Sequence, residues 1–275
     1  MLRRTFIHSL AAAAAVPLRA SGTRKHANDV VALGPAKVKL SRHAMGTWTR
    51  GGRASSNQTR QLRTDGLSDL FWYGYDNGLT FWDSADSYGS HPHVRHALSK
   101  VKREKVTIMT KTRARTADEM KTDLDRFRKE INTDYLDIVL LHARTSPRWD
   151  EEARGAMDVL SEAKEKGLVR THGISCHSIE ALRVAARHPW VEVDLARLNP
   201  IGSHMDADPA TVVSVLKEMK ANGKGIIGMK ILGEGDLRNR VDEALRFALA
   251  QDVLDCFTIG SENRNELADL IKRIG

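Results

Sequence analysis

The 275-residue sequence has few of the features that define special structural classes. Its two cysteines, Cys176 and Cys256, are too few for a disulfide scaffold. With only 7 prolines and 20 glycines, beside 41% apolar and 28% charged residues, it is not a collagen-like, low-complexity or disordered chain. The net charge of +8 comes from scattered lysines and arginines, with no basic stretch interleaved with aromatics. The composition therefore gives little support to nucleic-acid binding.

The apolar run near the N-terminus is too short to serve as a membrane anchor. Ala11–Val16 follows the pair Arg3-Arg4, and the small residue Ala20 ends the segment; crossing a bilayer takes about 20 apolar residues. This pattern is typical of a signal peptide, and the arginine pair resembles the twin-arginine type, which exports folded proteins. We expect residues 1–20 to engage the twin-arginine export machinery, which makes the protein periplasmic or otherwise exported, and cytoplasmic if the signal is not used. The alternative is an alanine-rich helical tail.

Residues 21–37 have no clear periodicity and are predicted to be a linker, whereas from residue 38 onward short apolar runs alternate with amphipathic segments. The runs have the aliphatic composition of strands buried on both faces; they are Leu79–Trp82, Val106–Met109, Ile138–Leu141, Gly173–Ser175, Leu195–Leu198, Ile226–Met229 and Cys256–Ile259. Helix signals lie between them, such as the capping box of Thr116 and Glu119 and the amphipathic segment Trp149–Lys166. Another helix opens at Asp208-Pro209.

A short strand near Ala44–Thr47 brings the number of predicted strands to eight, the number that closes a (β/α)8 barrel. An open doubly wound sheet would have a similar rhythm, but no Gly-x-Gly-x-x-Gly follows the first strand, which argues against a dinucleotide-binding Rossmann domain. The predicted fold is α/β, a (β/α)8 TIM barrel forming a single domain over residues 38–275.

Polar residues stand at or just past the carboxyl end of each later strand, where a barrel gathers them around one pocket. They are Asp83, Lys111, His142, Ser175, Asn199, Lys230 and Gly260, and Tyr88 follows in the loop after Asp83. A phenol is a weak acid, and a nearby ammonium such as that of Lys111 is expected to lower its pKa. Tyr88 then could protonate a developing alkoxide, while His142 orients a carbonyl.

Four motifs, in order and each at a strand end, together resemble the aldo-keto reductases. They are WDSADSYG (Trp82–Gly89), MTK (Met109–Lys111), DYLDIVLLH (Asp134–His142) and HGISCHS (His172–Ser178). Members of that family are (β/α)8 barrels that reduce aldehydes and ketones with NADPH, less often NADH. The resemblance implies a small-molecule carbonyl or alcohol substrate, with Tyr88 as general acid, Lys111 and Asp83 tuning it, and His142 orienting the carbonyl.

The same resemblance assigns a cofactor-binding set along the strand tops and loops. It implies contacts from Gly46, Thr47, Ser175, Cys176, Asn199, Lys230, Leu232, Gly233, Gly260, Ser261 and Arg264. Trp48, after the first strand, is the expected substrate contact. Gly260-Ser261 precede the last predicted helix, where backbone N–H groups favour a phosphate.

Three departures from the family pattern affect these expectations. Cys176 stands where asparagine is common, and Glu266 where many members place an arginine on the 2′-phosphate, so NADP(H) is only slightly preferred over NAD(H), with Arg264 or Lys272 as substitutes. Little of the family's C-terminal loop precedes Gly275, which predicts an open substrate pocket.

Two other functions remain open from the sequence. The departures also suit a reductase-like barrel that binds a nicotinamide as a sensor or subunit without turnover. The cluster His91, His93 and His96 suggests a metal-dependent hydrolase, although such a site needs further ligands on later strands and Lys111 would repel the ion.

Overall fold

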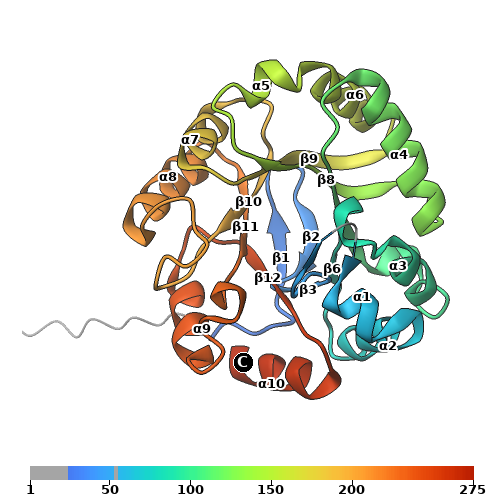
Figure 1. The fold of residues 1–275 in the computed structure, drawn as a ribbon, viewed down its shortest axis with the longest axis vertical. Coiled ribbons are helices and arrows are strands. Elements are labelled where there is room, and N and C mark those ends of the chain that lie inside the picture. The colour runs from blue at the N-terminus through green and yellow to red at the C-terminus, as the bar shows by residue number, and fades with distance from the viewer. Residues whose placement is uncertain (1–23, 53–54) are drawn as a thin grey trace, which may run out of the picture.

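The computed structural model describes residues 24–52 and 55–275 and contains a closed barrel of eight strands (Figure 1). Its neighbours, all paired in parallel, follow the order β10-β11-β12-β3-β6-β7-β8-β9. The strands are β3 (His43–Gly46), β6 (Phe81–Asp83), β7 (Thr107–Thr112), β8 (Leu136–Arg144), β9 (Val169–Cys176), β10 (Val193–Arg197), β11 (Gly225–Met229) and β12 (Cys256–Gly260). The predicted (β/α)8 fold is confirmed, while the predicted signal peptide, residues 1–20, lies outside the described residues.

Helices surround the barrel, as Figure 1 shows. The longer ones are α2 (Arg63–Asp76), α3 (His91–Ala97), α4 (Ala117–Ile131), α6 (Arg154–Glu165), α7 (Ile179–Arg187), α8 (Pro209–Ala221), α9 (Val241–Ala250) and α10 (Arg264–Ile274). Shorter pieces are α1 (Asn57–Gln61), α5 (Trp149–Glu152), η1 (Asp86–Tyr88), η2 (Arg103–Lys105) and η3 (Gly233–Gly235), with a small ribbon of β4 (Gly51–Gly52) and β5 (Ser55–Ser56). The part of the chain that the structure describes has no helix long and apolar enough to span a membrane.

Helix boundaries follow the capping signals of the sequence, with one exception. Thr116 and Glu119 form the predicted capping box of α4, and the Asp208 carboxylate accepts a hydrogen bond from the Thr211 N–H at the start of α8. The segment Trp149–Lys166, predicted as a single helix, is divided instead. Ala153 leaves helical geometry (φ −116°) and separates α5 from α6.

A β-hairpin fills the amino-terminal mouth of the barrel. β1 (Val30–Leu33) pairs antiparallel with β2 (Val38–Ser41), and Figure 1 shows both within the ring of strands. Leu33 and Leu40 are buried in the interior cluster of apolar side chains, and the turn at Gly34 lies against the first residue of β11. The prediction that 21–37 is a linker is therefore wrong for β1. Only Leu33 of this strand is buried in the core. The strand therefore has no regular alternation of buried and exposed residues that would mark it in the sequence.

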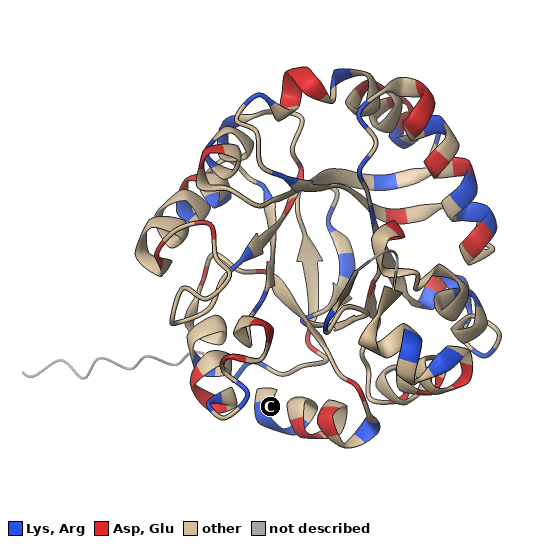
Figure 2. Cartoon of the chain, in the orientation of Figure 1, with Lys and Arg blue, Asp and Glu red and all other residues tan. Residues whose placement is uncertain are grey.

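Acidic and basic side chains alternate over the outer helices (Figure 2). Many pair within one helix, such as Arg126 with Asp123 and Glu130, or between neighbours, such as Arg187 with Glu218. Such exposed pairs contribute about 0–1 kcal/mol each. The charges that bear on function lie inside, at the carboxyl ends of the strands.

Candidate active site

The carboxyl ends of β6 and β7 hold a buried ion pair. Lys111, with none of its surface exposed, contacts the Asp83 carboxylate and donates a second hydrogen bond to the Ser84 carbonyl at 2.8 Å. The other Asp83 oxygen accepts from the Thr258 hydroxyl at 2.8 Å, which ties β12 to the pair. Burial lowers the pKa of Lys111, while the charge of Asp83 opposes that shift. Thr258 was not identified from the sequence, because a threonine within an apolar strand looks like ordinary filling.

Tyr88 lies directly over this ion pair and completes the set of four predicted residues. It ends the short helix η1, whose left-handed cap is Gly89 (φ 66°), and only 9% of its surface is exposed. The Lys111 ammonium lies 4.6 Å from the centre of the Tyr88 ring. The His142 ring meets Tyr88 edge-on at 5.6 Å between centroids, and the Trp48 ring packs on its other side at 4.8 Å.

The pKa of Tyr88 is raised, whereas the sequence led us to expect that Lys111 would lower it. Burial, reinforced by the charge of Asp83, raises the pKa of the Tyr88 phenol well above its usual 10. The expected lowering by Lys111 does not occur, because Asp83 neutralises the ammonium and desolvation dominates. Burial and the Lys111 charge hold the pKa of His142 well below 6.5. At neutral pH the site therefore presents a protonated phenol and a neutral imidazole.

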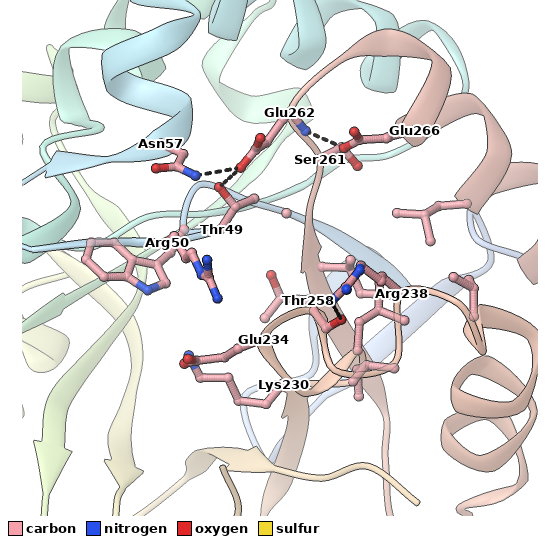
Figure 3. Close-up of a pocket in the computed structure, with 18 of the residues that line it drawn as sticks. Thr49, Arg50, Asn57, Lys230, Glu234, Arg238, Thr258, Ser261, Glu262 and Glu266 are labelled. Atoms are coloured by element: carbon pink, nitrogen blue, oxygen red, sulfur yellow. Dashed lines mark hydrogen bonds and ion pairs between the residues drawn. The ribbon is translucent and has the colours of Figure 1, made fainter. Parts of the chain in front are cut away.

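Two cavities are lined by residues that follow the carboxyl ends of the strands. The larger, of about 610 Å³, lies between η3, the end of β12 and α10 (Figure 3). Five predicted cofactor or substrate residues line it: Trp48, Lys230, Leu232, Gly260 and Ser261. The smaller, of about 260 Å³, is lined by His142 and residues of the following loop. Tyr88 contacts one lining residue of each cavity, Trp48 of the larger and His142 of the smaller.

Comparison with known families decides what this barrel is. The model of the aldo/keto reductase family matches residues 44–248, which is most of the chain and includes the four predicted catalytic residues. The chain belongs to the aldo/keto reductase family.

Individual relatives are distant. The probable aldo-keto reductase 1 of Glycine max is 30% identical over 146 residues, 48% of this chain and 41% of that protein. The NADH-specific methylglyoxal reductase of Escherichia coli (strain K12) is 22% identical over 201 residues, 64% of this chain and 60% of that protein. The chain thus spans about half the length of the curated relatives it matches.

Solved structures share the fold over nearly the whole chain. The holo form of an aldo-keto reductase from Bacillus halodurans aligns with a TM-score of 0.72 at 15% identity, covering 89% of this chain and 90% of that one. The glycerol dehydrogenase of Gluconobacter oxydans aligns with a TM-score of 0.70 at 16% identity, covering 90% and 91%. These likenesses show the barrel, and the chemistry has to be argued from this chain's own residues.

The residues around the larger cavity suit the nicotinamide dinucleotide that aldo/keto reductases use. The Ser261 hydroxyl, which lines this cavity, is buried and has no hydrogen-bond partner among the described residues, so it is available to a ligand. The Ser175 hydroxyl is also buried and without a partner there, but Ser175 lies off the lining of this cavity. Gly260 allows the backbone of the cavity wall to lie close to Thr49, because a Cβ at this position would be only 2.9 Å from the Thr49 side chain. Arg238 supplies positive charge beside the glycine-rich turn of η3, whereas Lys230 is paired with Glu234 on the same lining. Hydroxyls, open backbone and cations are the donors that an amide and a pyrophosphate require.

A carboxylate that was not identified from the sequence stands at the far wall of this cavity. Glu262 accepts hydrogen bonds from the Thr49 hydroxyl at 2.7 Å and the Asn57 amide at 3.1 Å (Figure 3). Its own N–H donates to the Glu266 carboxylate at 2.8 Å. In the sequence Glu262 is one of many charged residues that precede a helix. Its fixed position becomes clear only from its contact with Thr49, in the loop after β3.

Several predicted cofactor residues are committed elsewhere. Strand alternation turns the Cys176 side chain to the opposite face from Ser175, into the apolar layer beneath the helices. Asn199 donates to the carbonyls of Ser203 and Lys230 and accepts from two loop N–H groups, which uses its full hydrogen-bonding capacity. Both correct the expectation of side-chain contacts to the cofactor.

Thr47, Gly46, Gly233 and Arg264 also lie off the lining of the larger cavity. The Thr47 hydroxyl donates to the Asp83 carbonyl at 2.9 Å, and the Gly46 carbonyl accepts from Gln58 at 2.9 Å, so both fasten the first strand. Arg264 pairs with Asp69 of α2 at 3.0 Å, which directs the guanidinium away from the place predicted for a 2′-phosphate.

His91, the first histidine after Tyr88, is held by hydrogen bonds to neighbouring side chains. His91 uses both ring nitrogens, one with Glu130 and one with Thr110, each at 2.7 Å. Over residues 24–52 and 55–275 no group of three or more histidine, cysteine or acidic side chains is arranged to hold a metal ion. Nothing in this geometry favours the metal-hydrolase alternative.

Proposed function

We propose that the protein is an NAD(P)-dependent oxidoreductase that reduces an aldehyde or ketone to an alcohol, or runs the reverse reaction. One observation carries the proposal: Asp83, Lys111, Tyr88 and His142, from the ends of three neighbouring strands and the loop after the first of them, meet beside the cavity that His142 lines. One cavity has the donors for a nucleotide, and the other opens beside His142.

Each of the four side chains has a task that its surroundings support. Tyr88, protonated at neutral pH, donates its proton to the oxygen of the reacting carbonyl. His142, kept neutral, has one N–H with which to orient that oxygen. Lys111 and Asp83 are positioning residues that support the phenol from below. When bound, the nicotinamide supplies the hydride.

The experiment that tests this function replaces Tyr88 by phenylalanine, which keeps the ring and removes the proton. We expect turnover of an aldehyde panel to fall by about 10²-fold or more, while nucleotide binding is retained. Tyr75→Phe, on α2, is the matched control and should keep wild-type turnover. Unchanged turnover in Tyr88→Phe would contradict the proposal, and tight nucleotide binding with no turnover in the wild type would favour the sensor alternative.

We propose that the protein binds NAD(H) in preference to NADP(H), in contrast to the slight preference for NADP(H) expected from the sequence. Three carboxylates, Glu262, Glu266 and Asp269, line the cavity around the start of α10, while Arg264 is paired with Asp69 outside it. A 2′-phosphate would meet like charge there, whereas a ribose hydroxyl can donate to a carboxylate. Arg50 and Arg238 on the other walls are left for the pyrophosphate.

Fluorescence titration with both reduced nucleotides tests this preference. We expect NADH to bind at least tenfold more tightly than NADPH, and Glu262→Gln to narrow the difference by weakening the repulsion. Glu243→Gln, on α9 and paired with Arg240, is the control and should leave both affinities unchanged. Tighter NADPH binding in the wild type would restore the original expectation.

We also propose that residues 1–20 act as a twin-arginine signal and that the protein works outside the cytoplasm. The support is the pattern of Arg3-Arg4, Ala11–Val16 and Ala20 in the sequence. Because this route carries folded proteins, the nucleotide would bind before export. Replacing Arg3 and Arg4 by lysines should retain the protein in the cytoplasm in a fractionation experiment, and unchanged export would contradict the assignment.

A further inference from the structure

The smaller cavity beside His142 has an unusual density of positive charge. Of its lining residues, Arg113, Arg115 and Arg144 carry guanidinium groups, and Glu152 carries the single carboxylate. Within the described part of the chain only Arg115 forms an ion pair, a long one of 3.9 Å to Glu152. The space is too small for a nucleotide and suits a compact group of a few heavy atoms.

Arg144 is the most constrained of the three arginines. Only 6% of its surface is exposed, and its contacts are with backbone carbonyls, those of Ala114 at 2.6 Å and Arg113 at 3.3 Å. Its Nε is buried and has no partner among the described residues. Burial lowers the pKa of Arg144 to about 10, which still leaves it charged at neutral pH. A buried cation without a carboxylate is costly, and a bound anion would relieve that cost.

The backbone before Arg144 departs from regular strand geometry. The pairing of β8 with β9 shifts register between Leu141 and Arg144, and Ala143 adopts a positive φ of 54°. Bulges of this kind re-aim side chains at the ends of strands next to active sites. Here the irregular segment itself, His142 to Arg144, lines the cavity.

We propose that this arginine cluster, Arg113, Arg115 and Arg144, binds an anionic group of the substrate, so that the enzyme acts on carbonyl compounds carrying a carboxylate. A guanidinium offers parallel N–H donors that match the two oxygens of a carboxylate. The carbonyl end of the same molecule would then lie at His142, which lines the cavity and contacts the Tyr88 ring. This inference rests on the proposed function and names its substrate class.

The test compares two aldehydes of the same shape, 4-carboxybenzaldehyde and the neutral 4-nitrobenzaldehyde. In the wild type we expect kcat/KM to be at least tenfold higher for the carboxylate, since a charge-assisted hydrogen bond is worth roughly a factor of ten or more. Arg113→Ala should lower this ratio about tenfold, mainly through KM. Arg183→Ala, an exposed arginine on α7 remote from the cavity, is the charge-matched control and should leave the ratio unchanged.

Arg144→Lys gives a second variant that keeps the charge but loses the paired donors. A second substrate pair, glyceraldehyde 3-phosphate and glyceraldehyde, tests whether the bound anion is a phosphate. A higher kcat/KM for the anionic aldehyde in this pair alone would overturn the proposed carboxylate in favour of a phosphate. A wild-type ratio near one in both substrate pairs, or a ratio unaffected by Arg113→Ala, would overturn the proposal.

A binding measurement separates this proposal from the proposed function. Calorimetric titration with benzoate, with neutral benzyl alcohol for comparison, needs no turnover. Benzoate binding that Arg113→Ala weakens about tenfold would support the anion site even if no aldehyde were reduced, in which case the proposed function alone fails. Reduction of aldehydes without charge preference and without benzoate binding would leave the function standing and remove the anion site.

Discussion

Tyr88 illustrates how one side chain acquires a defined protonation state from its neighbours. The groups that face it are the Lys111 ammonium below the ring, the Asp83 carboxylate paired with that lysine, the neutral His142 at its edge and Trp48 on the other side. Arg113 and Glu234 act on it from further away with opposite signs. Since burial and Asp83 together disfavour the phenolate, the hydroxyl is a proton donor over the whole ordinary pH range.

This protonation state predicts different pH profiles for the two directions. A raised pKa means that the phenol stays protonated until well above pH 10, and a lowered pKa means that His142 stays neutral above pH 6.5. We expect kcat for reduction to be flat between about pH 6.5 and 9. Alcohol oxidation needs the phenolate, so its kcat should rise continuously with pH over the same range. A reduction profile that falls between pH 7 and 9 would indicate a lower pKa of Tyr88 than this structure implies.

At the level of single elements, the positions of strands and helices could be predicted from the sequence, and the uses of many loop residues could not. Asp83, Lys111 and His142 were found because each directly follows an apolar run, and a barrel collects such positions at one end. Asn199 and Arg264 were misassigned, because their partners, a loop carbonyl and Asp69, are contacts that no periodicity reveals.

The arginine cluster was missed for a related reason. Charged residues between a strand and a helix are usually solvated, so Arg113 and Arg115 carry no signal of their own. That these two loop arginines line one cavity with Arg144 and His142 depends on how β7 and β8 lie side by side in the barrel, which the sequence pattern does not show. The one available hint was Arg144 itself, a charged residue close behind the apolar run Ile138–Leu141.

Helix α8 provides a measurement of how much a cap contributes. The Asp208 carboxylate accepts from the Thr211 N–H at 3.0 Å and contacts its hydroxyl at 2.5 Å. Asp208→Ala should lower the free energy of unfolding by about 1 kcal/mol, because the first turn loses its acceptor. Urea denaturation at constant m-value is the measurement, and Asp208→Asn, which keeps an acceptor oxygen, should remain near wild type. Equal losses in the two variants would assign the effect to charge.

For the molecule as a whole, buried histidines set the response to acid. His43 is completely buried in β3, stacked at 6.0 Å on Phe257, and desolvation lowers its pKa from 6.5 to about 4. His172, beside Trp190, is lowered to about 4 in the same way. Between pH 6.5 and 4 the unfolded chain therefore binds more protons than the folded one, and acid favours unfolding.

We expect the free energy of unfolding to fall as the pH is lowered from 6.5 to 4, by about 3 kcal/mol from His43 alone. Asp194, whose pKa burial raises, contributes with the opposite sign, so the informative quantity is the difference between wild type and His43→Gln. In His43→Gln the free energy of unfolding should fall less steeply as the pH is lowered from 6.5 to 4. His26→Gln, at an exposed site, should show the same pH dependence as the wild type. Equal slopes in wild type and His43→Gln would refute the assignment.

The hairpin under the barrel has a consequence for any processing of the chain. Leu33 and Leu40 occupy space inside the ring, and the turn at Gly34 touches the start of β11. A peptidase that removes a leader must therefore cut before Val30, because loss of the hairpin would expose the apolar interior of the barrel to solvent. The hairpin thus closes the end of the barrel opposite the rim near Tyr88.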